Sequence, residues 1–251
     1  MLVETGDNVG IGGFIITGTI PKRVLLRAIG PSSVPDALAD PILELHGPPG
    51  FVTIINDNWR EPPLPQYTCE GTGIAPTNDL EPCIVVTLDT GAYTAIVYGR
   101  NNTSGVALVE VYDLNQAAAS QLGNISTRAF VSTGANIMIA GFILGGSGSG
   151  NDNVILRGIG PSLAQFGVPD VLADPTLELR DQSGTLIRSN DNWMDDPAQK
   201  ALIIAAGLAL PNTLESGIAA TLPPGPYTAL LAGLNNGTGV GLVEVYDRGS
   251  P

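Results

Sequence analysis

One stretch of this chain occurs twice, and that repeat limits the folds that the chain can adopt. Residues 35–45, PDALADPILEL, return as residues 169–179, PDVLADPTLEL, with 9 of 11 positions identical. At the same offset of 134, residues 93–113 match residues 227–247 at 14 of 21 positions. A fixed internal period of this kind indicates two homologous units. A feature found in both copies is therefore the better candidate for the common function.

Short apolar runs separated by turn signals fill both copies. The 251 residues include 32 Gly and 20 Pro, and about seven strands are expected in each unit. The pattern predicts an all-β fold of two tandem antiparallel β-sandwich domains, Ig-like or jelly-roll-like, related by internal duplication. The predicted boundaries are repeat 1 at 1–113, a linker at 114–123 and repeat 2 at 124–251.

The two copies diverge most after the tetrapeptide NDNW. In the second copy, Asp196, Pro197 and the stop at Gly207 predict an N-capped helix. In the first copy, the proline-rich residues 62–73 exclude a regular helix. One unit is therefore expected to hold this segment by apolar packing and the other by a cysteine bridge.

Cys69 and Cys83 are the only cysteines of the chain. Two thiols without partner His or Cys residues do not complete a tetrahedral metal site, so a disulfide or a pair of buried free thiols remain as alternatives. A disulfide predicts an oxidising, extracellular or cell-surface location.

The net charge excludes one class of partner. With 24 acidic and 11 basic residues the formal charge is -13, which repels a phosphate backbone, so nucleic acid is not an expected partner. No run of 18 apolar residues is present, so no membrane span is expected.

Catalytic patterns are weak. His46 is the sole histidine and its counterpart is Arg180, so a Ser-His-Asp or Cys-His device could exist in one unit at most. The carboxylates Asp40, Glu44, Glu110 and Asp113 are duplicated and could serve glycoside hydrolysis, or pair with the duplicated Arg27 and Arg157 on neighbouring strands. We favour the ion pairs and expect no enzyme activity.

Calcium is the metal that the sequence allows. The duplicated NDN tripeptides and a nearby aspartate supply the hard oxygen ligands that calcium prefers, although Asx residues also suit a tight turn. The pattern requires no cofactor, and the candidate calcium ligands are Asp40, Asn56, Asp57, Asn58, Asp174, Asn190, Asp191 and Asn192.

Trp59 and Trp193 end the NDNW tetrapeptides. They could form a stacking platform for carbohydrate, or pack at the rim of the core. With only 5% aromatic residues in the chain, we favour packing.

Several of these motifs together resemble a known kind of module. NISTRAFVSTGAN at 124–136, GIGPSL at 158–163, VLADPTLELRDQSG at 171–184 and SNDNW at 189–193 resemble tandem β-sandwich repeats of large secreted and surface proteins of environmental bacteria. The succession ADPTLEL, NDNW and GPYTALL is loosely similar to bacterial pre-peptidase C-terminal domains. The resemblance implies a secreted, accessory and non-catalytic module.

The second copy is preceded by a predicted strand that the first copy lacks. This candidate assembly strand comprises Asn124, Ile125, Ser126, Thr127 and Arg128, and its absence before Leu2 predicts an unpaired sheet edge in the first unit. We therefore expect a non-enzymatic extracellular structural protein that self-associates into an array, stalk or filament. The alternative is an adhesive or carbohydrate-binding module, either with or without a requirement for calcium.

Overall fold

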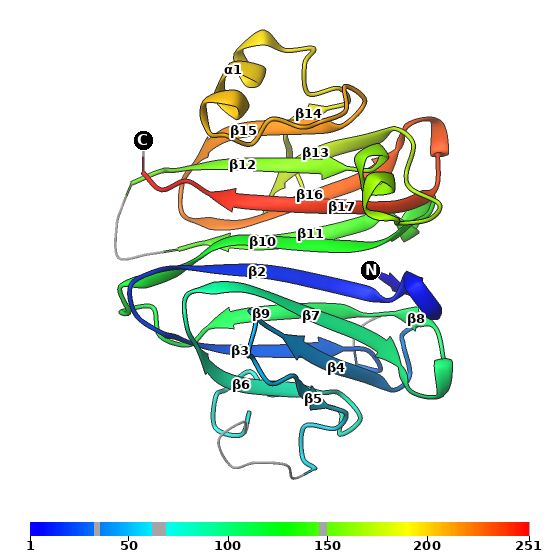
Figure 1. Ribbon diagram of the computed structural model, residues 1–251, viewed down its shortest axis with the longest axis vertical. Coiled ribbons are helices and arrows are strands. Elements are labelled where there is room, and N and C mark those ends of the chain that lie inside the picture. The colour runs from blue at the N-terminus through cyan, green and yellow to red at the C-terminus, as the bar shows by residue number, and fades with distance from the viewer. Residues whose placement is uncertain (33–35, 62–68, 146–149, 251) are drawn as a thin grey trace. The chain divides into compact units, whose positions relative to one another are not determined.

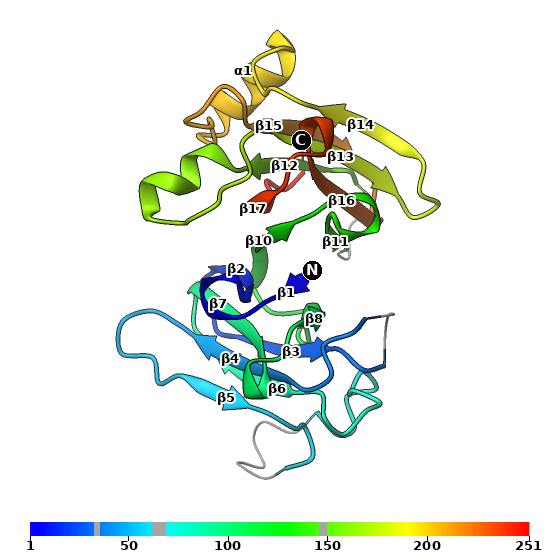
Figure 2. The same cartoon turned by 90° about the vertical axis from the view of Figure 1, so that its right-hand side faces the viewer.

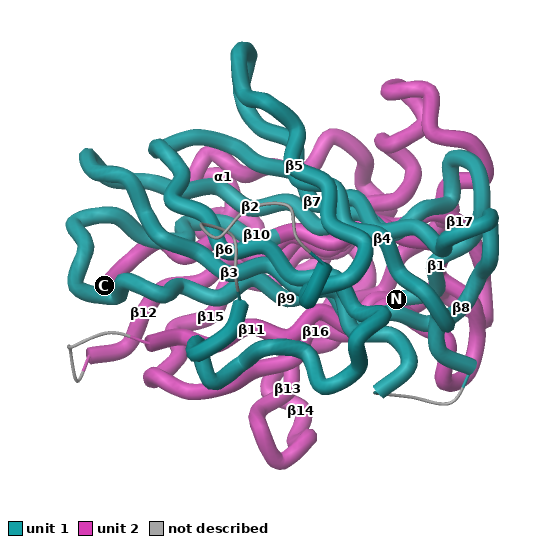
Figure 3. Tube along the Cα trace, turned by 90° about the horizontal axis from the view of Figure 1, so that it is seen from below, with its two compact units in different colours: residues 1–125 teal, residues 126–251 magenta. Residues whose placement is uncertain are grey.

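The computed structural model describes residues 1–32, 36–61, 69–145 and 150–250. The chain divides into two compact units, Met1–Ile125 and Ser126–Pro251 (Figure 3). Both units consist mainly of antiparallel strands, as the repeat pattern predicts. Among the described residues, no helix is long and apolar enough to cross a membrane.

Unit 1 has two sheets (Figure 1). One has the strand order β2, β7, β4, β5, and the other has the order β6, β3, β9. A short β1 pairs with β8. The bounds are β1 (Leu2–Val3), β2 (Gly10–Gly18), β3 (Lys22–Ile29), β4 (Pro41–His46), β5 (Ile54–Asn56), β6 (Cys83–Leu88), β7 (Gly91–Gly99), β8 (Gly105–Val106) and β9 (Leu108–Asp113).

Unit 2 repeats this plan. One sheet has the order β11, β16, β13, β14, and β12 of the other sheet lies between β15 and β17. The bounds are β11 (Met138–Leu144), β12 (Asp152–Ile159), β13 (Pro175–Asp181), β14 (Leu186–Asn190), β15 (Ser216–Leu222), β16 (Gly225–Gly233) and β17 (Gly239–Asp247), with the helix α1 (Pro197–Ala205) and short 3-10 turns at Gly6–Asn8, Arg100–Asn102, Gly134–Asn136, Pro161–Phe166 and Leu234–Asn236.

The strand β10 (Ser120–Val131) contributes to both units. Its residues 120–125 belong to unit 1, and residues 126–131 belong to unit 2. The predicted linker is therefore too long, because residues 120–123 are already strand. The candidate assembly strand, residues 124–128, lies in the middle of β10.

Strand registers agree between the units. Arg27 of β3 lies opposite Cys83 on one side and Glu110 on the other. Arg157 of β12 lies opposite Gly217 and Glu244 in the same way. Equivalent residues of the two copies therefore occupy equivalent positions in their sheets.

The core of unit 1 lies between its two sheets. Alternate residues of β2, β4 and β7 face those of β3 and β6, and the rings of Phe14 and Tyr93 stack with centroids 5.4 Å apart. In unit 2, Phe142 and Tyr227 stack in the same way at 5.5 Å. Burying one such large apolar side chain contributes about 1.5–3 kcal/mol to stability, which explains why the period-2 pattern fixes each strand's inner face.

The turns that follow β7 and β16 require the left-handed region of backbone conformation. Asn101 and Asn102 have φ of 57°, and Asn235 and Asn236 have φ of 54° and 63°. Asparagine tolerates this conformation better than most residues, which explains its place in both turns.

A segment in which no strand is described covers the outer face of one sheet in each unit. We call its described residues, 57–61 and 69–82 in unit 1 and 191–215 in unit 2, the covering segments. In unit 1, Cys69 and Ile74 pack on Leu25 and Val85. In unit 2 the segment contains α1, which lies beside β15 (Figure 2), and Ile203 packs against the outer face. The predicted N-cap is confirmed, because Asp196 accepts hydrogen bonds from the backbone N–H groups of Ala198 and Gln199. Part of the proline-rich stretch of the first copy, residues 62–68, lies outside the described residues.

Candidate functional site

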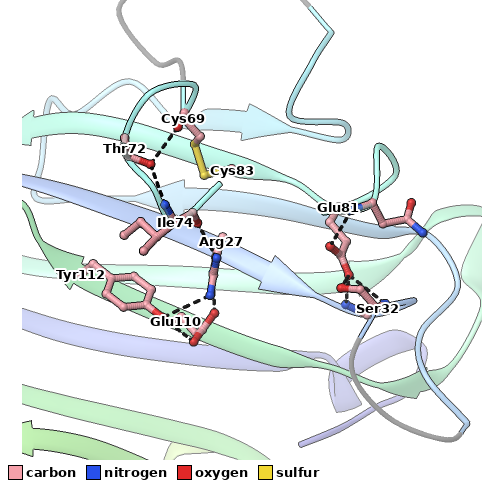
Figure 4. A network of polar contacts seen from close by, with 11 residues as sticks. Arg27, Ser32, Cys69, Thr72, Ile74, Glu81, Cys83, Glu110 and Tyr112 are labelled. Carbon is pink, nitrogen blue, oxygen red and sulfur yellow. Dashed lines mark hydrogen bonds and ion pairs between the residues drawn. A yellow bond between two sulfur atoms is a disulfide. The ribbon is translucent and has the colours of Figure 1, made fainter. Parts of the chain in front are cut away.

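A buried glutamate ties each covering segment to the loop that follows β3 or β12. Glu81 is fully buried, and its Oε1 accepts hydrogen bonds from Gly30 N (3.1 Å), Ser32 N (3.1 Å) and Ser32 Oγ (2.6 Å) (Figure 4). In unit 2, Glu215 is equally buried and accepts from Ser162 N at 3.0 Å and from Ser162 Oγ. Each buried carboxylate therefore has its hydrogen-bond partners within its own unit.

Neither glutamate was predicted from the sequence as a functional residue. Glu81 and Glu215 occupy the same position of the repeat, and this duplication was visible in the sequence. However, the sequence around a single acidic residue does not reveal that its side chain is buried.

An arginine ties the covering segment to the neighbouring strand. Arg27 Nε lies 2.5 Å from Glu110 Oε2, its Nη1 donates to the carbonyl oxygen of Ile74, and its Nη2 donates to Tyr112 Oη at 3.2 Å (Figure 4). Burial alone lowers the pKa of Arg27, but the hydrogen bond and charge of Glu110 outweigh burial and raise that pKa. The predicted ion pair between Arg27 and Glu110 is confirmed.

The same network recurs in unit 2. Arg157 Nη2 lies 2.6 Å from Glu244 Oε2, and Arg157 Nη1 donates to the carbonyl oxygen of Leu208 at 3.3 Å. Burial and the nearby charge of Glu244 raise the pKa of Tyr246 to about 12. The duplicated Arg and Glu residues thus hold the molecule's own backbone.

Cys69 and Cys83 form a disulfide with a Cα–Cα distance of 6.3 Å (Figure 4). Their counterparts in unit 2 are Ile203 and Gly217. A Cβ atom on Gly217 would lie 2.8 Å from Ile203 Cδ1, because the isoleucine fills the space beside that glycine. One unit therefore uses a covalent bond where the other uses apolar packing, as the sequence predicts.

The first asparagine of each NDN tripeptide is a backbone anchor. Asn56 Oδ1 accepts from Cys83 N at 2.8 Å, and Asn190 Oδ1 accepts from Gly217 N at 2.7 Å. These oxygens are occupied by strand donors, so the set of candidate calcium ligands narrows to three residues in each unit.

The remaining three candidates share one property in both units. Each has an Oδ1 atom that is buried and has no hydrogen-bond partner within the described structure, and these atoms belong to Asp40, Asp57, Asn58, Asp174, Asp191 and Asn192. Buried oxygen atoms of this kind are costly unless they are paired. We call these groups the unit 1 and unit 2 oxygen clusters.

The two oxygen clusters differ in charge. In unit 1, Arg100 Nη1 contacts Asp57 Oδ2, and its Nε lies 4.0 Å from Asp40 Oδ2. In unit 2, Leu234 stands at the position of Arg100. Burial, followed by the charges of Asp174 and Asp195, raises the pKa of Asp191. The described residues contain no group of three or more His, Cys, Asp or Glu side chains arranged to hold a metal ion.

His46 is a surface residue at the end of β4. Its Nε2 lies 2.9 Å from Glu44 Oε2, and Tyr98 Oη donates to Glu44 Oε1 at 2.7 Å. In unit 2 its counterpart Arg180 binds Glu178 Oε2, at 2.6 Å. Because an arginine replaces the histidine in the same contact, the structure supports a pairing role for His46.

The tryptophans pack rather than form a platform. Trp193 is only 2% exposed, so it offers no face to a sugar ring. Trp59 is partly buried, and Arg60 lies over its ring at 4.4 Å. Both indoles donate Nε1 to a carbonyl oxygen of the covering segment, Asn78 or Asn212, at 3.1 Å.

Unit 2 also has an open groove of about 500 Å³ beside α1. Its lining is mainly apolar and includes Ile187, Leu202 and Ala206, with Arg188 and Arg248 as its charged residues.

No protein-family model and no curated protein match this chain. Among solved structures, the chain is similar to one titled PNGF-II, with 11% identity and a TM-score of 0.23 over 97% of this chain and 62% of that chain. It is also similar to VP2 of the infectious bursal disease virus subviral particle, with 10% identity and a TM-score of 0.21 over 98% of this chain and 70% of that chain. Neither likeness is close enough to bear on function.

Proposed function

We propose that this chain is a non-enzymatic, extracellular structural protein, a building block of a surface array, stalk or filament whose copies join by strand pairing. The observation that carries this proposal is the edge strand β11 of unit 2.

β11 is the counterpart of β2 at an offset of 128, but the two strands have different neighbours. In unit 1, the start of β10 lies beside the end of β2, where Thr19 N donates to Ala119 O at 3.3 Å. Among the described strands, β11 pairs with β16 alone. Its second row of backbone donors and acceptors is therefore open to another strand.

The side chains of β11 suit such a contact. Ile139 and Ile143 are 52% and 74% exposed, whereas their counterparts Ile11 and Ile15 in β2 are half-buried. Exposed apolar residues on an unprotected edge favour strand addition, because pairing removes both the open hydrogen bonds and the apolar surface from water.

Unit 1 offers a second open edge. Among the strands that the structure describes, β9 pairs with β3 alone, whereas its counterpart β17 has β10 as a second neighbour. A second copy of this chain is the occupant that we propose for these edges, because each copy carries both.

The duplicated polar residues support a structural role. Arg27, Glu81 and Asn56, like their counterparts in unit 2, bind the backbone of their own unit. The disulfide supports an extracellular setting, where such bonds persist.

Electron microscopy and light scattering of the purified chain at increasing concentration test the proposal. We expect ordered assemblies, and we expect Ile139→Lys with Ile143→Lys to weaken association at least tenfold, because lysine on an edge strand opposes pairing. Ile204→Lys is the matched control, since Ile204 is a 50% exposed isoleucine on α1, away from the edge. Monodisperse monomers at high concentration, or equal effects of the two substitutions, would contradict the proposal.

A further inference from the structure

The backbone places residue 100 and residue 234 at equivalent points of the two oxygen clusters. Arg100 N donates to the carbonyl oxygen of Asp40 at 2.8 Å, and Leu234 N donates to that of Asp174 at 2.8 Å. The side chain at this position therefore begins next to Asp40 in unit 1 and next to Asp174 in unit 2.

In unit 1 that side chain is a cation. The guanidinium of Arg100 reaches both carboxylates, Asp57 and Asp40, and supplies a positive charge between them. Two nearby carboxylates repel each other unless a cation lies close to both.

In unit 2 the cation is missing and the carboxylates remain. Leu234 carries no charge, yet Asp174 and Asp191 occupy the repeat positions of Asp40 and Asp57. Oδ1 of Asp174, Asp191 and Asn192 are all buried without a hydrogen-bond partner in the described structure. Asn192 donates its Nδ2 to Asp195 Oδ2 at 3.2 Å, which leaves its amide oxygen as the free acceptor.

The unit 1 cluster repeats the unpaired amide oxygen of Asn192. Asn58, the counterpart of Asn192, is only 9% exposed, and its Oδ1 also has no partner. The same unpaired amide oxygen thus occurs beside two carboxylates in both units.

We propose that unit 2 binds a hard divalent cation, calcium, between Asp174, Asp191 and Asn192, and that Arg100 takes the place of this ion in unit 1. One chain then binds one ion. This inference is independent of strand pairing between copies.

The ligand chemistry fits calcium better than magnesium. Calcium accepts six to eight oxygen ligands in flexible geometry, whereas magnesium demands a near-ideal octahedron and loses water reluctantly. Two carboxylates and one amide leave the other positions to water. Such a set suits the weak binding of extracellular modules, with a Kd of about 10⁻⁴–10⁻³ M.

Isothermal titration calorimetry and thermal unfolding with calcium chloride, against chelator-treated protein, test the site. We expect one ion per chain and a rise in Tm of about 5 °C at a calcium concentration about tenfold above Kd. A stoichiometry of zero or of two for the unaltered chain would overturn the proposal.

Charge exchange between the units makes the test sharper. Leu234→Arg places the unit 1 cation in unit 2 and should abolish calcium binding, whereas the neutral control Leu234→Met should retain it. Arg100→Leu should create a second site and raise the stoichiometry from one to two. Calcium binding by Leu234→Arg that equals that of Leu234→Met would overturn the assigned location, and circular dichroism of each variant shows whether it is folded.

Discussion

At the scale of single residues, several charged side chains form hydrogen bonds with backbone groups of their own unit. Glu81 and Glu215 are fully buried in a chain with a net charge of -13, so each must be satisfied by donors of its own unit. Both accept backbone N–H groups from the loop after β3 or β12. Removing such an acceptor costs more than an average hydrogen bond, because the buried donors are left unpaired.

Glu81→Gln should lower the free energy of unfolding by about 2–3 kcal/mol, because one carboxylate oxygen is replaced by an amide donor. That donor would face Asn78 N, which approaches Glu81 Oε2 at 3.4 Å. Urea unfolding measures the change. Glu61→Gln is the control, since Glu61 is exposed, and a loss below about 0.5 kcal/mol for Glu81→Gln would show that the contact is dispensable.

Sequence reasoning identified the residues whose types restrict their roles. The cysteine pair and the Arg27 ion pair were predictable, because few structures suit two lone cysteines or a duplicated arginine and glutamate on neighbouring strands. The buried state of Glu81 depends on distant chain segments that come together only in the fold, so no local pattern shows it. The contrast between Arg100 and Leu234 was visible in the alignment of the copies, but its meaning needed the position of Asp57.

At the scale of elements, the strands follow from alternation of apolar residues, but their ends do not. Residues 120–123, SQLG, lack the β-branched and aromatic residues that mark a strand, yet they begin β10. The hydrogen bond at Ala119 and the close approach of Gly123 to Thr17 place them beside β2, so tertiary contacts override weak local propensity.

The packing of the unit 2 covering segment predicts the effect of a single methyl group. Gly217→Ala should destabilise the protein by about 1–3 kcal/mol, because overpacking a filled site forces its neighbours to move. The new Cβ would lie 2.8 Å from Ile203 Cδ1 and 3.1 Å from Trp193 Cβ. Thermal unfolding measures the loss of stability. Gly145→Ala is the control, because a Cβ atom on Gly145 would have no neighbouring atom within 4 Å. Equal Tm values for the two variants would show that Ile203 can move aside.

At the scale of the whole molecule, charge opposes the association that the open edges favour. Each copy carries a formal charge of -13, so two copies repel at long range. The proposed strand pairing acts only at short range, between backbones that are nearly in contact.

Association should therefore strengthen with ionic strength. Raising sodium chloride from about 0.01 M to about 0.15 M shortens the Debye length from about 30 Å to about 8 Å, which screens the repulsion but leaves the hydrogen bonds of an edge intact. Analytical ultracentrifugation should show a larger assembled fraction at the higher salt concentration. Dissociation by salt would indicate that ion pairs hold the copies together, and would count against strand pairing.

The two covering segments are attached at matching points although they differ in sequence. In each unit the backbone N–H of the tryptophan donates to the backbone carbonyl oxygen of the buried glutamate. The pairs are Trp59 with Glu81 and Trp193 with Glu215. An arginine side chain binds a carbonyl oxygen within the segment in both units. Between these points one unit has a disulfide-bonded loop and the other a helix, so the sandwich does not dictate what the segment contains. Foreign peptides grafted there would inherit the same attachment, which makes each unit a ready host for libraries of engineered loops.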